Sequence, residues 1–138
     1  YPLWKKYKSD EFFFDEEFFD FCKFLHDRSS GEQVELVLNG DIFDFDSVTG
    51  KPAKPTYRIS WVEQMTGLHP QKDKSNFKIK RILEDHPIWN EALKWFLEKG
   101  HRIVFVIGNH DLELHWETVQ EEIINFLDLS DEHKKNIR

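Results

Sequence analysis

The sequence predicts an α/β fold in which parallel strands alternate with helices. Two short apolar runs, 34–38 and 102–107, each lead into a glycine turn and have the length of buried strands. Helical apolar patterns lie before, between and after these runs. This order is a βαβ unit, so we expect the two strands to be parallel neighbours, or near neighbours, joined by a right-handed crossover.

The first helix is expected to begin at Ser9 or Asp10, either of which can cap it, and to run to about His26. Its apolar residues recur at helical spacing and are expected to face the core: Phe14, Phe18, Phe21 and Leu25. The lone cysteine, Cys22, excludes an internal disulfide framework and is interpreted as a buried apolar residue.

Further helices are expected over 76–85, 87–99 and 116–127, followed by a helical turn at 130–135. Pro87 suits a first helical turn, and Gly100 suits the position after a helix. Residues 46–75 lack a clear period and are expected to form a long insertion loop, with a short helix near Trp61. We expect this loop to contact a substrate or a partner.

The 138 residues allow one domain, and we expect residues 1–138 to be part of a longer chain. The net charge of −7 argues against duplex nucleic acid as a partner. No apolar run approaches the ~20 residues of a membrane-spanning helix, so no transmembrane segment is expected. A cytoplasmic location is expected, and the sequence leaves the oligomeric state open.

Two polar motifs follow the predicted strands. Gly40-Asp41-Ile42-Phe43-Asp44 comes after the first, and Gly108-Asn109-His110-Asp111 after the second. Carboxylate and amide oxygens can bind divalent cations, and an imidazole can donate a proton to a leaving group. Each motif alone could be an ordinary polar turn. Because ligands bind outside the carboxyl ends of strands in open α/β sheets, the two together indicate a shared site.

Both motifs resemble those of the calcineurin-like metallophosphoesterases. The resemblance implies the N-terminal half of an α/β/β/α sandwich. It implies that Asp41 bridges two metal ions, that Asn109 binds the second ion, and that His110 is the catalytic histidine. Asp44 would orient this histidine. The spelling of the motifs is closest to the bacterial branch that includes UDP-diacylglucosamine pyrophosphohydrolases.

Other motifs of that family have no counterpart here. No Asp-x-His precedes residue 34, and the lone His and Gly-His-x-His are also missing. Asp131-Glu132-His133 matches the first spelling by chance, in a polar helical turn. Gly100-His101 is interpreted as a helix end, and His115 as a surface residue. The missing ligands would lie outside the 138 residues.

The family's chemistry is direct hydrolysis, in which two divalent metals hold the phosphate and activate a water molecule. Mn²⁺, Fe or Mg²⁺ suits an oxygen-rich site, and Zn²⁺ is also allowed. The expected substrate is a phosphorylated small molecule, a nucleotide or a lipid-linked pyrophosphate.

Two alternatives remain. Asp44 and Asp46 resemble the Asp-x-Asp of haloacid-dehalogenase-type phosphatases, in which Asp44 would attack phosphorus, Asp46 would act as acid and base, and one Mg²⁺ would be bound. This alternative leaves residues 108–111 unexplained. The chain could also be a non-catalytic scaffold that keeps the metallophosphoesterase fold.

Overall fold

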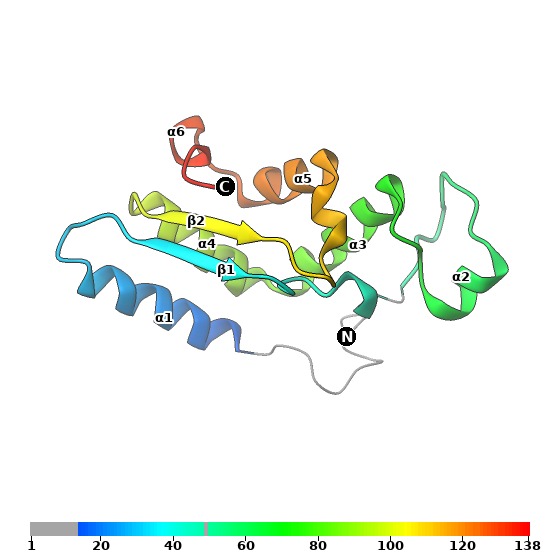
Figure 1. The fold of residues 1–138 in the computed structure, drawn as a ribbon, viewed down its shortest axis with the longest axis horizontal. Helices are drawn as coiled ribbons and strands as arrows, with labels where there is room; N and C mark the ends of the chain where they lie inside the picture. The colour runs from blue at the N-terminus through cyan, green and yellow to red at the C-terminus, as the bar shows by residue number, and fades with distance from the viewer. Residues whose placement is uncertain (1–13, 49) are drawn as a thin grey trace.

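The computed structural model describes residues 14–48 and 50–138 and confirms a mixed α/β fold with a parallel sheet. The predicted cap at Ser9 or Asp10 lies outside these residues. In chain order (Figure 1), the elements are α1 (Asp15–Arg28), β1 (Glu35–Asn39), η1 (Phe45–Ser47), α2 (Trp61–Thr66), α3 (Lys72–Asp85), α4 (Pro87–Glu98), β2 (Arg102–Val106), η2 (Leu112–His115), α5 (Glu117–Leu127) and α6 (Asp131–Lys134).

The sheet consists of β1 and β2, which run parallel and side by side (Figure 1). Their register is continuous from the Glu35–Arg102 pair to the Asn39–Val106 pair, so both strands end at the same level. The predicted parallel neighbours are therefore confirmed. This level ending brings the residues after β1 next to the residues after β2.

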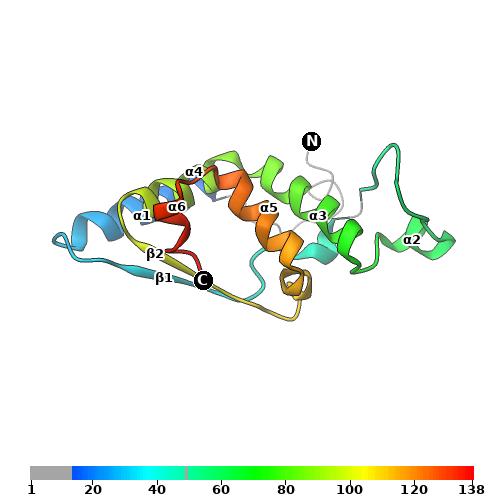
Figure 2. The ribbon, with the colours of Figure 1, turned by 90° about the horizontal axis from the view of Figure 1, so that it is seen from above.

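The sheet carries helices on one side. Figure 2 shows α1, α4 and α5 on the same side of the two strands. Ile103 of β2 faces this side and is fully buried, whereas Val37 and Val106 remain 49% and 40% exposed. The expectation of buried strands was therefore wrong for β1, where exposed and half-buried residues alternate, and in β2 it holds only for Ile103. Alternation of this kind is typical of a strand that is covered on one face.

The core lies between the covered sheet face and the helices. Apolar residues at helical spacing form the inward face of α4, and α3 and α5 contribute their own apolar faces. Full burial of such side chains contributes roughly 1.5–3 kcal/mol each. The buried residues of these helices include Ile79, Leu83, Ala92, Leu93, Phe96, Leu97, Val119, Ile123 and Leu127.

The buried face of α1 differs from the predicted stripe. Cys22 is fully buried as expected, but Phe14 and Phe21 are 60% and 45% exposed. Phe18 and Leu25 pack against the core as predicted, and Phe19 does so in addition. The rings of Phe18 and Phe19 contact two tryptophans of α4, Trp89 and Trp95. Helical spacing alone did not determine which side of α1 faces the core. The aromatic side chains of α4 select the side that is centred on Cys22. Burial raises the pKa of the Cys22 thiol to about 11, so the thiol stays protonated at neutral pH.

The 46–75 segment contains the expected short helix, and α3 begins within it at Lys72, four residues earlier than predicted. Ser60 and Glu63 form a reciprocal cap on α2. The Glu63 carboxylate also accepts a 2.5 Å hydrogen bond from Lys74 of α3, and both side chains are buried. Lys74 and the backbone N–H groups of Ser60 and His69 hold the pKa of Glu63 well below its usual range. The ionised Glu63 thus ties α2 to α3.

Among the helices of residues 14–48 and 50–138, none combines the length and apolar character that a bilayer crossing requires.

A histidine pair, the buried His101 and the half-buried His26, lies at the end of the sheet where the strands begin. Nδ1 of His101 accepts a hydrogen bond from the Val34 N–H at 3.1 Å, so the neutral ring carries its proton on Nε2. That Nε2 lies 2.9 Å from Nδ1 of His26. Burial, and then the neighbouring His26, lower the pKa of His101. The fold therefore favours a neutral His101.

This pair predicts a loss of stability in acid. Because the folded pKa of His101 lies below its unfolded value of about 6.5, its contribution is complete above that pH and falls as the pH drops below it. The slope from this residue is at most about 1.4 kcal/mol per pH unit. Urea unfolding between pH 8 and 5 should show a shallower acid loss for His101→Gln. His115→Gln, a change at an exposed histidine, should keep the original slope. Equal slopes for all three proteins would contradict this role.

Candidate metal centre

The two predicted motifs meet where the strands end. A methyl group placed on Gly40 would lie 3.2 Å from the Cα atom of Gly108, so the two glycine backbones are in contact. Gly40 has a φ of +77°, a conformation that favours glycine. Two segments that lie almost 70 residues apart in the chain therefore form one edge of the sheet.

Asp41 lies directly against Gly108. A Cβ atom at Gly108 would be 2.3 Å from both the backbone N and Oδ1 of Asp41, which leaves no room for any side chain at this position. Oδ1 of Asp41 accepts a 3.0 Å hydrogen bond from the backbone N–H of His110. Asp41 as a whole is exposed, and its backbone is left-handed with a φ of +49°. The carboxylate is thus fixed in direction and open to solvent.

Asp111 holds the two motifs together. Its side chain is fully buried and accepts hydrogen bonds from three successive backbone N–H groups, those of Ile42, Phe43 and Asp44, at 2.6, 2.9 and 3.2 Å. A carboxylate provides enough acceptor sites for three donors. In addition, the N–H of Phe45 donates to the carbonyl of His110 at 3.2 Å. The last residue of the second motif therefore shapes the backbone of the first.

Aromatic and acidic residues alternate after Ile42. Phe43 and Phe45 are buried, whereas Asp44 is half-buried and Asp46 is exposed. The ring of Phe43 stacks on Phe105 of β2, with 6.0 Å between ring centres and 11° between planes. The two phenylalanines thus anchor this segment in the core, and the two aspartates remain near the surface beside the site.

His110 lies between these aspartates. Its Nδ1 is 3.5 Å from Oδ2 of Asp46 and 3.9 Å from Oδ1 of Asp44, and its side chain is half exposed. The hydroxyl of Ser47 donates a short hydrogen bond to Oδ2 of Asp44. Asp44 is thus near the imidazole, as the resemblance implies, but Asp46 is nearer. Both carboxylates are close enough to Nδ1 to fix the orientation of the ring.

Asn109 is exposed in the turn between Gly108 and His110. Because the His110 N–H binds the Asp41 carboxylate, Asn109 lies on the same edge as Asp41. The four predicted site residues, Asp41, Asp44, Asn109 and His110, are therefore brought together at the carboxyl ends of the strands.

A buried ion pair lies beneath the site. Nζ of Lys78 in α3 is 3.5 Å from Oε1 of Glu113, and both side chains are almost fully buried. Burial raises the pKa of Glu113; Lys78 opposes this shift, and the nearby Asp46 adds to it. The surroundings of residues 41–46 are thus rich in carboxylates and have one buried ammonium group nearby.

The donors at this edge fit a hard or borderline divalent cation. Asp41 offers carboxylate oxygen and Asn109 offers amide oxygen, and both side chains reach solvent. In the part of the chain that the structure describes, no group of three His, Cys, Asp or Glu side chains could hold a metal ion. Of the predicted ligands, Asp41 and Asn109 both lie at this edge.

The other histidine-containing spellings lie elsewhere. His133 and Asp131 belong to the surface helix α6, where the carboxylate of Asp131 is almost fully exposed. His115 is exposed at the end of η2. Gly100-His101 follows the end of α4 as predicted, and His101 is in addition buried and bonded to His26.

Sequence reasoning missed the structural roles of Asp111, Asp46 and the Lys78–Glu113 pair. The sequence did contain a clue to the role of Asp111, because this acidic residue directly follows Asn-His in the second motif. For Lys78 the helical pattern gave none, since a lysine on α3 is expected to face water.

Comparisons of the chain with models of protein families, with curated proteins and with solved structures found no match.

Replacing Asp111 by alanine should strongly destabilise the protein. Three backbone N–H groups would lose their acceptor, and each buried unsatisfied group costs about 1–3 kcal/mol. We expect the free energy of unfolding to fall by at least about 3 kcal/mol. Asp131→Ala, at an exposed aspartate, should change it by less than about 0.5 kcal/mol. Similar small losses in both variants, measured by urea unfolding, would refute the bridging role of Asp111.

Gly108→Ala should displace Asp41. The added methyl group would collide with its backbone and carboxylate, so the hydrogen bond to His110 must break. In proton–nitrogen NMR spectra, the largest shifts should fall on residues 40–42 and 109–111. Gly100→Ala is the control, because a methyl group there meets nothing within 4 Å and the strain of its left-handed backbone, with a φ of +84°, is confined to that turn. Its changes should stay near residue 100, and the amides of residues 40–42 should not move.

Proposed function

We propose that this chain is part of a dinuclear metal-dependent phosphohydrolase of the calcineurin-like metallophosphoesterase type. This function is supported above all by one contact, the hydrogen bond from the His110 backbone to the Asp41 carboxylate. This bond connects Asp41, a carboxylate that could bridge two metal ions, to the turn that carries the amide of Asn109 and the imidazole of His110. A full α/β/β/α sandwich and a cytoplasmic location belong to the same proposal.

Asp41 and Asn109 would hold the metal ions, together with ligands from outside the 138 residues. Metal ions bound there would supply positive charge for a phosphate group and a water molecule acidified for attack on phosphorus. This supply of charge matters because the edge itself is acidic, with Asp41, Asp44 and Asp46 close together. An anionic substrate would otherwise be repelled.

The chain's own contribution to the chemistry is centred on His110. Its half-exposed imidazole can donate a proton or a hydrogen bond to an oxygen of the phosphate or the leaving group. Asp46 and Asp44 next to Nδ1 would hold the ring in one orientation. With Nδ1 directed at these carboxylates, Nε2 would be the nitrogen that faces the substrate.

The substrate would be a phosphate ester or pyrophosphate of a small molecule, a nucleotide or a lipid-linked compound. The amino acids of the two motifs favour the bacterial branch of the family that includes UDP-diacylglucosamine pyrophosphohydrolases. Alone, the 138 residues should not hydrolyse a generic aryl phosphodiester, because they carry too few metal ligands.

The one-metal alternative is also testable here, because Asp44 and Asp46 flank His110. Titration with Mn²⁺ should broaden the amide NMR signals of residues 41 and 108–110 first, since the paramagnetic ion relaxes nearby nuclei. Asp41→Asn should weaken this effect about tenfold, the size of loss that changes at metal sites commonly cause. Asp46→Asn should change it much less.

Different results would favour the alternatives. Broadening centred on residues 44–46 that survives Asp41→Asn would support the haloacid-dehalogenase-type site. Broadening no stronger at this edge than at the acidic surface turn of Asp131 and Glu132 would support a scaffold without metal chemistry.

A further inference from the structure

The C-terminal residues pair with β2 through an isolated parallel bridge on the edge away from β1. The N–H of Ile103 donates to the carbonyl of Asn136 at 2.9 Å, and the N–H of Arg138 donates to the carbonyl of Ile103 at 3.0 Å. The N–H of Phe105 then donates to the carbonyl of Arg138 at 2.8 Å. These bonds form a parallel bridge in which Ile137 is the partner of Ile103. The hydrogen bonds between β2 and the C-terminal residues stop at Phe105, although β2 itself continues to Val106 and is followed by Ile107.

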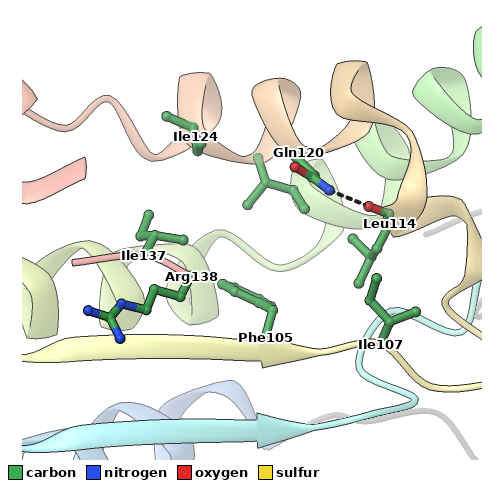
Figure 3. A pocket seen from close by; sticks show the side chains of 8 residues that line it. Phe105, Ile107, Leu114, Gln120, Ile124, Ile137 and Arg138 are labelled. Carbon is green, nitrogen blue, oxygen red and sulfur yellow. Dashed lines mark hydrogen bonds between the residues drawn. The ribbon is translucent and has the colours of Figure 1, made fainter. Parts of the chain in front are cut away.

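An apolar pocket of about 220 Å³ lies just beyond this ladder, between β2 and α5 (Figure 3). Figure 3 shows Phe105 directed into it from β2, and the Gln120 side chain at its upper edge, bonded to the Leu114 carbonyl at 2.7 Å. An apolar cavity of about 150 Å³ holds a benzene-sized group, so this pocket has room for apolar side chains. Its apolar lining is formed by Phe105, Ile107, Leu114, Ile123, Ile124 and Ile137.

The phase of the strand matches the position of the pocket. Side chains alternate between the faces of a strand, so Ile103, Phe105 and Ile107 share the face that the helices cover. Since Ile137 is the partner of Ile103, the first residue after Arg138 would lie beside Phe105, and the third beside Ile107. Both positions are next to residues that line the pocket.

We propose that this pocket receives a third parallel strand, formed by polypeptide that continues from Arg138 and carries apolar side chains at its first and third positions. In a parallel ladder, the second added residue would donate to the carbonyl of Phe105 and accept from the N–H of Ile107. The strand would end level with Gly108. This inference stands apart from the proposed phosphohydrolase activity, because it uses neither the metals nor the site residues.

The test compares two four-residue extensions of the chain with the same composition. Val-Thr-Val-Thr after Arg138 places its valines toward the pocket, whereas Thr-Val-Thr-Val turns them to the opposite face, because a shift of one residue inverts a strand. The first extension should raise the thermal midpoint above that of the unextended chain. It should also slow hydrogen exchange at the Ile107 amide by about tenfold or more, as expected for an amide newly bonded in a sheet.

The second extension should leave both quantities close to those of the unextended chain. Equal behaviour of the two extended chains would overturn the proposal, whether both are stabilised, unchanged or unfolded. A separate Val-Thr-Val-Thr peptide at the protein's own concentration should give no protection, because it lacks the high effective concentration of a covalent continuation. Protection by the separate peptide would instead identify the pocket as a site for another chain.

Discussion

The buried carboxylate of Asp111 is the interaction on which the arrangement of the site depends. It receives three backbone N–H groups from the segment after β1, although it belongs to the segment after β2. Without it, the left-handed backbone at Asp44 and the exposed position of Asp41 would have no common support. Hydrogen bonds to a charged acceptor are among the stronger ones in proteins, and this one is shielded from water. The site is therefore held by its own loops as much as by the sheet beneath them.

The charge distribution follows from this arrangement. The core-facing side of this segment is occupied by Phe43 and Phe45. Its solvent-facing side therefore carries the aspartates, Asp41, Asp44 and Asp46. Like charges in one short segment favour a cation nearby. The imidazole of His110 lies beside two of these carboxylates, and bound divalent cations would balance their charge under the proposed function.

Much of the fold was predictable, because it depends on local patterns. The apolar runs that became β1 and β2, and the apolar face of α4, are read directly from spacing. The meeting of Asp41 with the Asn109–His110 turn was also predictable, since parallel strands that end at one level deliver their next residues to one edge.

What could not be predicted depends on contacts between distant segments. The rotation of α1 depends on Trp89 and Trp95, which lie about 70 residues further along the chain. The burial of Lys78 depends on Glu113, and the neutral state of His101 on Val34 and His26. None of these contacts can be inferred from the spacing of apolar residues in the nearby sequence.

The open face of the sheet has a consequence for how the chain behaves in solution. Val37 and Val106 keep much of their surface in water, and a two-stranded sheet has little stability of its own, so these strands depend on the helices of one side. Salts such as sulfate, which strengthen apolar burial, should favour self-association of chains through this surface. Covering it with a further layer of protein would remove that tendency and would also stiffen the ends of both strands, where the acidic edge begins.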